Sequence, residues 1–270
     1  MEEFQFEDEF FEIEDKRQRH FIDTNYCPEV ATLGGFQQPT ESLFNSENGP
    51  SKIQNLIEYM YLKKQYIEAW DLCQQWFLYN RSLQKSFKDG QLLEISIRLN
   101  IKLDDVKTAL DLTNQFSEAN SKEAGVIFLK GHVYLLNSLF NDALKQLRLY
   151  LESRTQDYKA WIEIAHVFVK ASKQSGPEYG LSFRQWAYLA LKNSLYFIER
   201  SPRPTTVYKE IHIQQEVETL KLELASLQID SFSENLDSSI LQLLKVDEET
   251  SNWLLQHIRV TMDEEPINRT

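Results

Sequence analysis

The sequence has little of what metal binding or disulfide formation requires. Its 270 residues include two cysteines, Cys27 and Cys73, which form no Cys-x-x-Cys pair, and no two histidines stand at ligand spacing. We therefore expect neither a zinc site nor a disulfide framework, and we interpret the compartment as reducing. No cofactor is expected.

Long apolar runs are also absent. No window approaches eighteen uninterrupted apolar residues, and the N-terminal segment MEEFQFEDEFFEIEDKRQ is acidic instead of basic and then apolar. These features predict a soluble intracellular chain, cytoplasmic or nuclear, without direct membrane insertion.

Positive charge is scarce. The chain has 29 Lys and Arg against 41 Asp and Glu, a formal net charge of −12. Nucleic-acid binding needs basic helix faces, and this balance argues against them, so no nucleic acid is expected as a partner.

Catalytic motifs are missing as well. Gly34-Gly35 stands alone without a phosphate-binding loop, and neither G-x-S-x-G nor H-E-x-x-H occurs. Cys73 occupies a helix-packing position and is interpreted as a core residue instead of a nucleophile. The prediction is a protein that is not an enzyme; an active site would have to form between distant helices, where no motif reveals it.

The sequence divides into three zones. Residues 1–50 join an acidic-aromatic arm to a linker rich in Gly, Pro, Ser and Asn, and are expected to be largely extended or disordered. Residues 51–202 carry apolar side chains at helical spacing with few glycines or prolines. Residues 203–270 contain a long amphipathic segment and then one or two short helices.

An internal repeat runs through the second zone. Shifting the chain by 34 positions places Ile127 on Trp161, Gly131 on Ala165 and Tyr134 on Phe168. The alanine of the following helix falls at residues 69, 109, 143 and 190. The last interval contains 13 extra residues, which we assign to the turn between the two helices of the fourth pair.

These positions resemble the tetratricopeptide repeat, in which a small residue on the first helix admits the second. The resemblance implies an all-α fold, a right-handed α-solenoid of about four degenerate helix pairs, followed by a C-terminal capping helix with Val217, Leu220 and Leu224 on its inner stripe. An irregular helical bundle is the alternative. The acidic-aromatic start, the Asn-Tyr-Cys at 25–27 and the helix pairs together also resemble an uncharacterised family of animal repeat proteins.

The resemblance implies a protein-binding scaffold whose first helices line a groove. One subclass clamps the C-terminal carboxylate of heat-shock chaperones with lysine, asparagine and arginine. The matching positions here hold other residues, so that clamp is not expected: Gln54, Glu58, Glu94, Ile95, Phe128 and Leu129.

A different feature lies at one groove position of successive repeats. Arg98, His132 and His166 are spaced 34 and 34 residues apart. They predict a ladder of cationic or titratable groups that binds an acidic or phosphorylated peptide through charge-assisted hydrogen bonds. The alternative is that each side chain serves a local partner.

The N-terminal arm is the second predicted partner-binding segment. Phe4, Phe6, Phe10 and Phe11 supply apolar area, and eight acids through residue 15 keep the segment soluble. Such a segment folds on a partner or across the groove of its own chain, or it docks permanently as a strand or helix.

Two functions are compatible with these features. The first is a non-enzymatic adaptor for complex assembly, with one partner in the groove and a second on the arm. The second is a permanent structural subunit of a larger intracellular complex. Salt-sensitive, substoichiometric partners favour the adaptor, and a fixed-ratio assembly favours the subunit.

Overall fold

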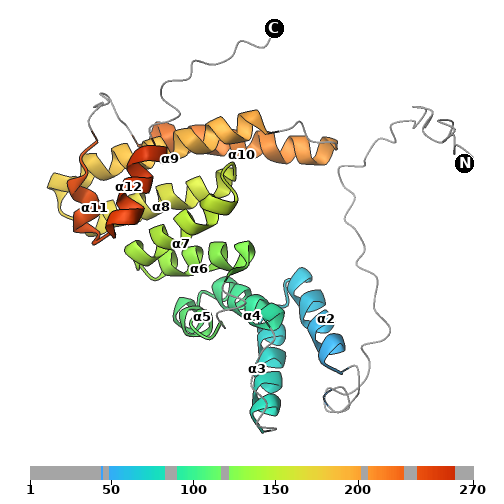
Figure 1. Ribbon diagram of the computed structural model, residues 1–270. Coiled ribbons are helices and arrows are strands. Elements are labelled where there is room, and N and C mark those ends of the chain that lie inside the picture. The colour runs from blue at the N-terminus through green and yellow to red at the C-terminus, as the bar shows by residue number, and fades with distance from the viewer. Residues whose placement is uncertain are drawn as a thin grey trace, which may run out of the picture. The chain divides into compact units, whose positions relative to one another are not determined.

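The computed structural model describes residues 44, 49–82, 90–116, 122–201, 206–227 and 236–258, which belong to the second of two units of the chain, Thr40–Thr270. Every regular element within these ranges is a helix (Figure 1), so the all-α prediction is confirmed there. The N-terminal arm with Phe4, Phe6, Phe10 and Phe11 lies outside the described residues.

Figure 1 labels the described helices. Their bounds are α2 Gly49–Leu62, α3 Tyr66–Ser82, α4 Gly90–Lys102, α5 Val106–Thr113, α6 Ala124–Leu136, α7 Phe140–Ser153, α8 Tyr158–Gln174, the 3-10 helix η4 Pro177–Tyr179, α9 Gly180–Arg200, α10 Val207–Ser226, α11 Ser239–Leu243 and α12 Glu248–His257.

Consecutive helices pack as pairs: α2 with α3, α4 with α5, α6 with α7, and α8 with α9. Each pair then contacts the next along the chain, and the first helices also meet, α2 with α4 and α6 with α8. The buried apolar residues form three clusters that each span neighbouring pairs. The pairing of consecutive helices follows the order that the repeat predicts.

The turn inside the first three pairs has one repeated backbone geometry. Lys64, Asp104 and Ser138 each have a φ near +60°, and the next amide bonds five residues back, as from Leu139 N–H to Tyr134 O at 2.9 Å. This is a helix-ending Schellman arrangement. The buried alanines at 69, 109 and 143 each follow five residues after the left-handed residue, so turn and packing position recur together.

Gly131 is the small residue that lets α7 approach α6. A Cβ placed on Gly131 would lie 3.0 Å from Leu147 Cγ and 3.6 Å from the Ala143 carbonyl oxygen. Ala165, its counterpart on α8, is fully buried, as is Ala190 on α9. The packing predicted for these positions is therefore present.

The extra residues of the fourth pair are not a loop. Between α8 and α9 stand only Ser175, Gly176 and η4, and most of the predicted insertion extends the two helices. The prediction that all 13 residues lie in the turn is wrong. Gly176-Pro177 and Gly180 had the composition of a loop, but Gly180 begins α9.

The connection after α6 is tied to pairs on both sides. Lys170 on α8 donates from Nζ to the carbonyl oxygens of Leu135 and Leu136, at 3.0 and 2.7 Å. Asn137 donates to Val106 O at 2.9 Å. A cation at the end of a helix satisfies carbonyls that the helix leaves unpaired.

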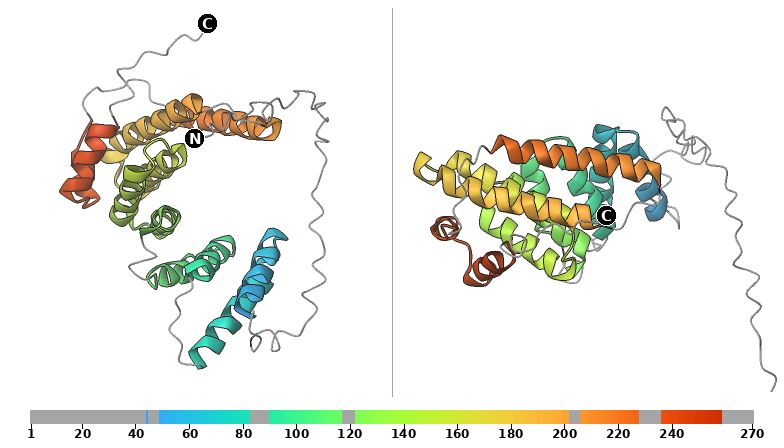
Figure 2. Two further views of the ribbon diagram at one scale, coloured as in Figure 1. Left: turned by 45° about the vertical axis from the view of Figure 1, so that its right-hand side comes forward. Right: turned by 90° about the horizontal axis from the view of Figure 1, so that it is seen from above.

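The helix α10 lies beside α9 (Figures 1 and 2), and the residues predicted for its inner stripe face the core. Leu220 is buried, and Val217 and Leu224 contact the same core. The Tyr158 hydroxyl on α8 donates to a carboxylate oxygen of Glu216, which fixes α10 against the fourth pair. Burial and this hydrogen bond raise the pKa of Tyr158.

The last two helices form a further hairpin that sequence reasoning did not recognise as a pair. Lys245 has a φ of 56°, and Val246 N–H bonds to Leu241 O at 2.9 Å, as in the earlier turns. Asp247 caps α12 through Thr250 N–H at 2.8 Å. The hairpin places α12 on α7.

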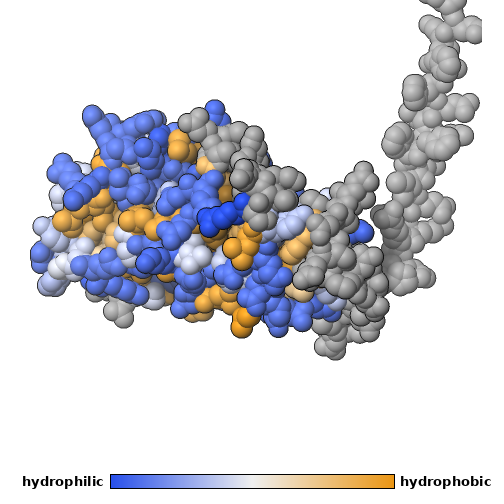
Figure 3. Space-filling model, turned by 90° about the horizontal axis from the view of Figure 1, so that it is seen from below, coloured by the Kyte–Doolittle hydropathy of each residue, from blue (hydrophilic) through white to orange (hydrophobic). Residues whose placement is uncertain are grey.

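Within the described residues, no helix combines the length and the apolar character needed to cross a membrane. The face in Figure 3 is mainly hydrophilic, with apolar patches between the polar side chains.

Candidate functional site

A cavity of about 240 Å³ is lined by the first helices of the four pairs. Tyr61 comes from α2, Arg98 and Lys102 from α4, His132 from α6 and Glu163 from α8. We refer to it as the first-helix cavity. Side chains from all four helix pairs line this one cavity.

Helical spacing explains how these side chains share the cavity. Arg98 and Lys102 are four residues apart on α4, and Phe128 and His132 are four apart on α6. Residues at this spacing lie on the same face of a helix. The packing of the helix pairs places these faces of α4 and α6 on the same cavity.

The cavity is less acidic than the chain as a whole. Arg98 and Lys102 carry positive charges, Glu163 is the one carboxylate of the lining, and Glu94 pairs with Arg98 beside it. The chain as a whole has a net charge of −12. Cationic side chains that reach solvent on an acidic protein are the groups to which anions are attracted.

Arg98 keeps part of its charge available to solvent. Its guanidinium bonds to Glu94 Oε1 from Nη2 at 2.7 Å and from Nε at 3.0 Å, and its side chain is 45% exposed. A guanidinium has five N–H donors, so this contact leaves others for a ligand. Arg98 therefore has a local partner, as the alternative predicts, and its guanidinium also reaches solvent.

His132 is held against the fourth pair. Its Nδ1 lies 3.0 Å from Glu163 Oε2, and both side chains are partly buried. The contact joins α6 to α8 at the cavity. It also places a carboxylate beside the imidazole, where it competes with an incoming anion.

His166, the third rung of the predicted ladder, does not line this cavity. Its Nε2 lies 3.7 Å from Glu223 Oε2 of α10. The structure thus brings Arg98 and His132 to one cavity and places His166 beside α10. The contact with α10 is a tertiary one that the 34-residue spacing does not reveal.

Lys102 and Tyr61 are cavity residues that sequence reasoning missed. The position of Lys102, one turn after Arg98, was a usable signal because the two residues share a helix face. Tyr61 stands just before the left-handed turn at Lys64, so its counterparts in the other pairs are Ile101 and Leu135. No residue pattern marked it.

The described residues contain neither an exposed thiol nor a cluster of metal ligands. Cys73 is fully buried, and burial raises the pKa of its thiol to about 12, which keeps it protonated. No group of three His, Cys, Asp or Glu side chains within the described ranges has the geometry to hold a metal ion. The first-helix cavity offers recognition by charge and shape.

No family model, no curated protein and no solved structure matches this chain. The likeness to tetratricopeptide repeats consequently depends on the residues named above. The function has to be argued from the site.

Proposed function

We propose that this protein is a non-enzymatic interaction scaffold, a right-handed α-solenoid of tetratricopeptide-like pairs that holds an acidic or phosphorylated partner segment in the first-helix cavity. The observation that carries the proposal is the position of Arg98, Lys102 and His132 in one cavity, on first helices. A second partner binds the N-terminal acidic-aromatic arm. The protein serves as an adaptor in complex assembly.

The recurrence of helix pairs supports the scaffold. Repeated pairs that contact only their neighbours form an extended surface from equivalent helix faces. In this chain the equivalent faces of α2, α4, α6 and α8 supply the cavity. An acidic segment lying across them meets Arg98 and Lys102 of the second pair and the His132 imidazole of the third.

Charge-assisted hydrogen bonds provide the affinity. Such bonds contribute roughly 1.5–3 kcal/mol each, about tenfold or more in binding. Because Arg98 is 45% exposed, part of that energy is lost to solvent screening and depends on salt. Binding of an acidic peptide is therefore expected to weaken as ionic strength rises.

The test is fluorescence anisotropy with a labelled acidic peptide, the same peptide phosphorylated, and a neutral analogue with Gln in place of Glu. Arg98→Ala with Lys102→Ala is expected to weaken acidic-peptide binding by about tenfold or more. The control is Lys107→Ala with Lys209→Ala, which removes equal charge from exposed positions outside the cavity. Equal losses in both double variants would contradict the proposal.

One observation favours the second function, a permanent subunit. Leu62, Ile67 and Leu78 on α2 and α3 are 68%, 65% and 65% exposed. Large apolar side chains at one end of the repeats suit a lasting interface. Size fractionation of cell extract at low and high salt separates the two: a fixed-ratio, salt-resistant assembly supports the subunit, and salt-released partners support the adaptor.

A further inference from the structure

The second helix of the first pair, α3, has apolar side chains on two opposite faces. One face packs with α2 and α4 (Figure 1), and its buried residues are Ala69, Leu72, Cys73 and Trp76. On the other face, Ile67 and Leu78 are each 65% exposed. A helix of a soluble protein ordinarily carries polar residues on the side away from its core.

The exposed apolar face belongs to the first pair and not to the repeat. Leu78 lies nine residues after the buried alanine of its helix. The residues at this position of the other three pairs are Glu118, Glu152 and Glu199. The counterparts of Ile67, two residues before the alanine, are Lys107, Asn141 and Tyr188. Every counterpart carries a polar group, so the packing of the repeat does not account for the two apolar side chains.

The two residues are the ends of one stripe along α3. Ile67, Asp71, Gln74 and Leu78 follow one another at intervals of four, three and four residues, and all four are exposed. At this spacing they lie within an arc of about 60° over roughly 16 Å of helix. The same intervals form the seam of a coiled coil, where the stripe packs against a second helix. We refer to these four residues as the α3 stripe.

The α3 stripe reads the same in both directions, with an apolar residue at each end and a polar residue at each inner position. If two copies pack antiparallel about a twofold axis, Ile67 meets Leu78 of the second copy, and Asp71 meets Gln74. The Gln74 amide is then a donor for the Asp71 carboxylate. A parallel pair would instead place the two Asp71 carboxylates together, where they repel. The polar residues therefore favour the antiparallel arrangement.

We propose that a second copy of this chain covers the α3 stripe, in an antiparallel and twofold-symmetric contact between the two α3 helices. The proposal goes beyond the scaffold function and requires neither the first-helix cavity nor an acidic partner. A contact between two helices of 17 residues is smaller than the interface of a stable complex, about 1,200–2,000 Å². The dimer is therefore expected to be weak, with a dissociation constant of about 10–100 μM.

Charges outside the stripe set the salt dependence of the dimer. The antiparallel register places Lys64 near Arg81 of the second copy, and both residues are exposed. Each copy also has a net charge of −12. Both effects oppose association, so the dimer is expected to strengthen as salt screens them. Binding of an acidic peptide in the first-helix cavity has the opposite salt dependence.

The test is analytical ultracentrifugation of the full chain, from micromolar to several hundred micromolar, at low and high salt. Leu78→Glu gives the first pair the residue that the other pairs carry, and Ile67→Glu changes the other end of the stripe. Each is expected to raise the dissociation constant at least tenfold. Leu222→Glu, at a 72% exposed position on α10, is the matched control and should leave it unchanged. Circular dichroism checks that each variant folds.

Variants of Gln74 test the register without removing apolar area. Gln74→Lys places a cation opposite Asp71 at two symmetric positions and is expected to strengthen the dimer several-fold. Gln74→Glu places two acids opposite each other and is expected to weaken it several-fold. Gln215→Lys and Gln215→Glu, at an exposed position of α10, make the same charge changes outside the stripe.

Three results would overturn the proposal. The first is a chain that stays monomeric at the highest concentration and salt. The second is a dimer that folded Leu78→Glu does not weaken, and the third is that the two Gln74 variants fail to shift the dissociation constant in opposite directions. The Arg98→Ala/Lys102→Ala variant is expected to dimerise normally, so loss of peptide binding and loss of the dimer are separate outcomes.

Discussion

Arg148 on α7 and Glu249 on α12 are 101 residues apart in the sequence, yet their side chains meet at 2.8 Å between Nη1 and Oε1. The same nitrogen lies 2.7 Å from Glu152 Oε1, one helical turn away. The Arg148 side chain is 5% exposed, whereas both carboxylates reach solvent. One buried cation thus joins the C-terminal hairpin to the third helix pair.

This arrangement predicts strong coupling between the two carboxylates. Glu152→Ala or Glu249→Ala leaves Arg148 one partner, so each is expected to cost about 1 kcal/mol or less. The double variant leaves a buried cation unpaired, which costs about 3–5 kcal/mol. Urea unfolding of the four proteins measures the coupling, and additive costs would show that the two carboxylates act independently.

The close approach of α6 and α7 predicts opposite effects at two glycines of one helix. Gly131→Ala places a Cβ 3.0 Å from Leu147 Cγ, and Leu147 is fully buried and has little room to move. Gly125→Ala meets nothing within 4 Å and gains helix propensity. We expect Gly131→Ala to be less stable than Gly125→Ala by about 1–3 kcal/mol in urea unfolding. Equal stability would show that Gly131 is not a packing position.

The cap of α12 predicts a pH dependence of stability. Hydrogen bonds from Thr250 lower the pKa of Asp247 below its ordinary value of 3.8, so the folded state favours the carboxylate. The stability from this group is present above the unfolded pKa and is lost as pH falls below about 4 through the folded value. Asp247→Ala is expected to cost about 0.5–2 kcal/mol at neutral pH.

Tryptophan fluorescence during acid titration checks the cap, because Trp253 lies on α12 and stacks on Trp161. The wild-type protein should lose stability through this pH window. Asp247→Asn should be less dependent on pH there, because it cannot gain or lose the proton. An identical acid transition in both proteins would assign the pH dependence to other groups.

Glu163 predicts a gain of function in the first-helix cavity. Its carboxylate lies 3.0 Å from His132 Nδ1 and opposes an incoming anion. Glu163→Gln is expected to raise the affinity for an acidic peptide several-fold in anisotropy measurements. Glu199→Gln, on the exposed face of α9, is the matched control. An unchanged or lower affinity in Glu163→Gln would show that the peptide does not approach His132.

The helix pairs were predictable because their signals are local. Small residues such as Gly131, Ala143 and Ala165 stand at repeated positions near aromatic residues in the sequence. In the structure Ala143 and Ala165 are buried, and Gly131 allows α7 to lie close to α6. The prediction of a long turn in the fourth pair was wrong because Gly176-Pro177 is typical of a loop. In the structure the neighbouring residues instead lengthen α8 and α9, whose contact with each other stabilises the added turns.

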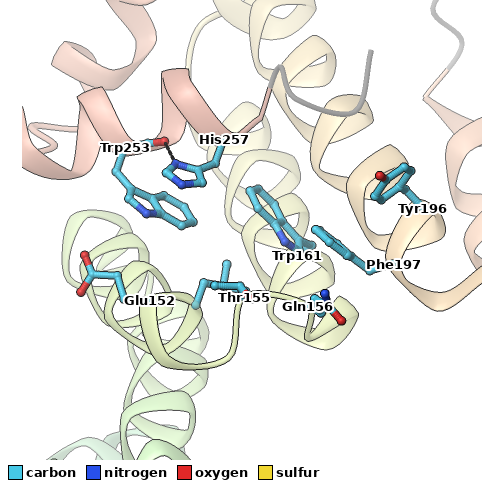
Figure 4. A pocket seen from close by; sticks show the side chains of 9 residues that line it. Glu152, Thr155, Gln156, Trp161, Tyr196, Phe197, Trp253 and His257 are labelled. Carbon is cyan, nitrogen blue, oxygen red and sulfur yellow. Dashed lines mark hydrogen bonds between the residues drawn. The ribbon is translucent and has the colours of Figure 1, made fainter. Parts of the chain in front are cut away.

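The proposed binding surface was less predictable because it depends on tertiary contacts. Arg98 and His132 share a cavity as their spacing suggested, but α10 places Glu223 beside His166. Trp161 and Trp253 stack on each other (Figure 4), and nothing local connects a residue of the fourth pair to the last described helix. The docking of α12 on Arg148 supplies that connection.

Photo-crosslinking with peptide mapping tests most directly whether an acidic partner segment lies across the first helices. A labelled acidic peptide that carries a photoreactive group is crosslinked to the full chain, and the modified residues are found by mass spectrometry. We predict crosslinks on α2, α4, α6 and α8 around Tyr61, Arg98 and His132, suppressed in Arg98→Ala/Lys102→Ala. Crosslinks confined to α10 or α12, or unchanged in that variant, would contradict the proposed mode of binding.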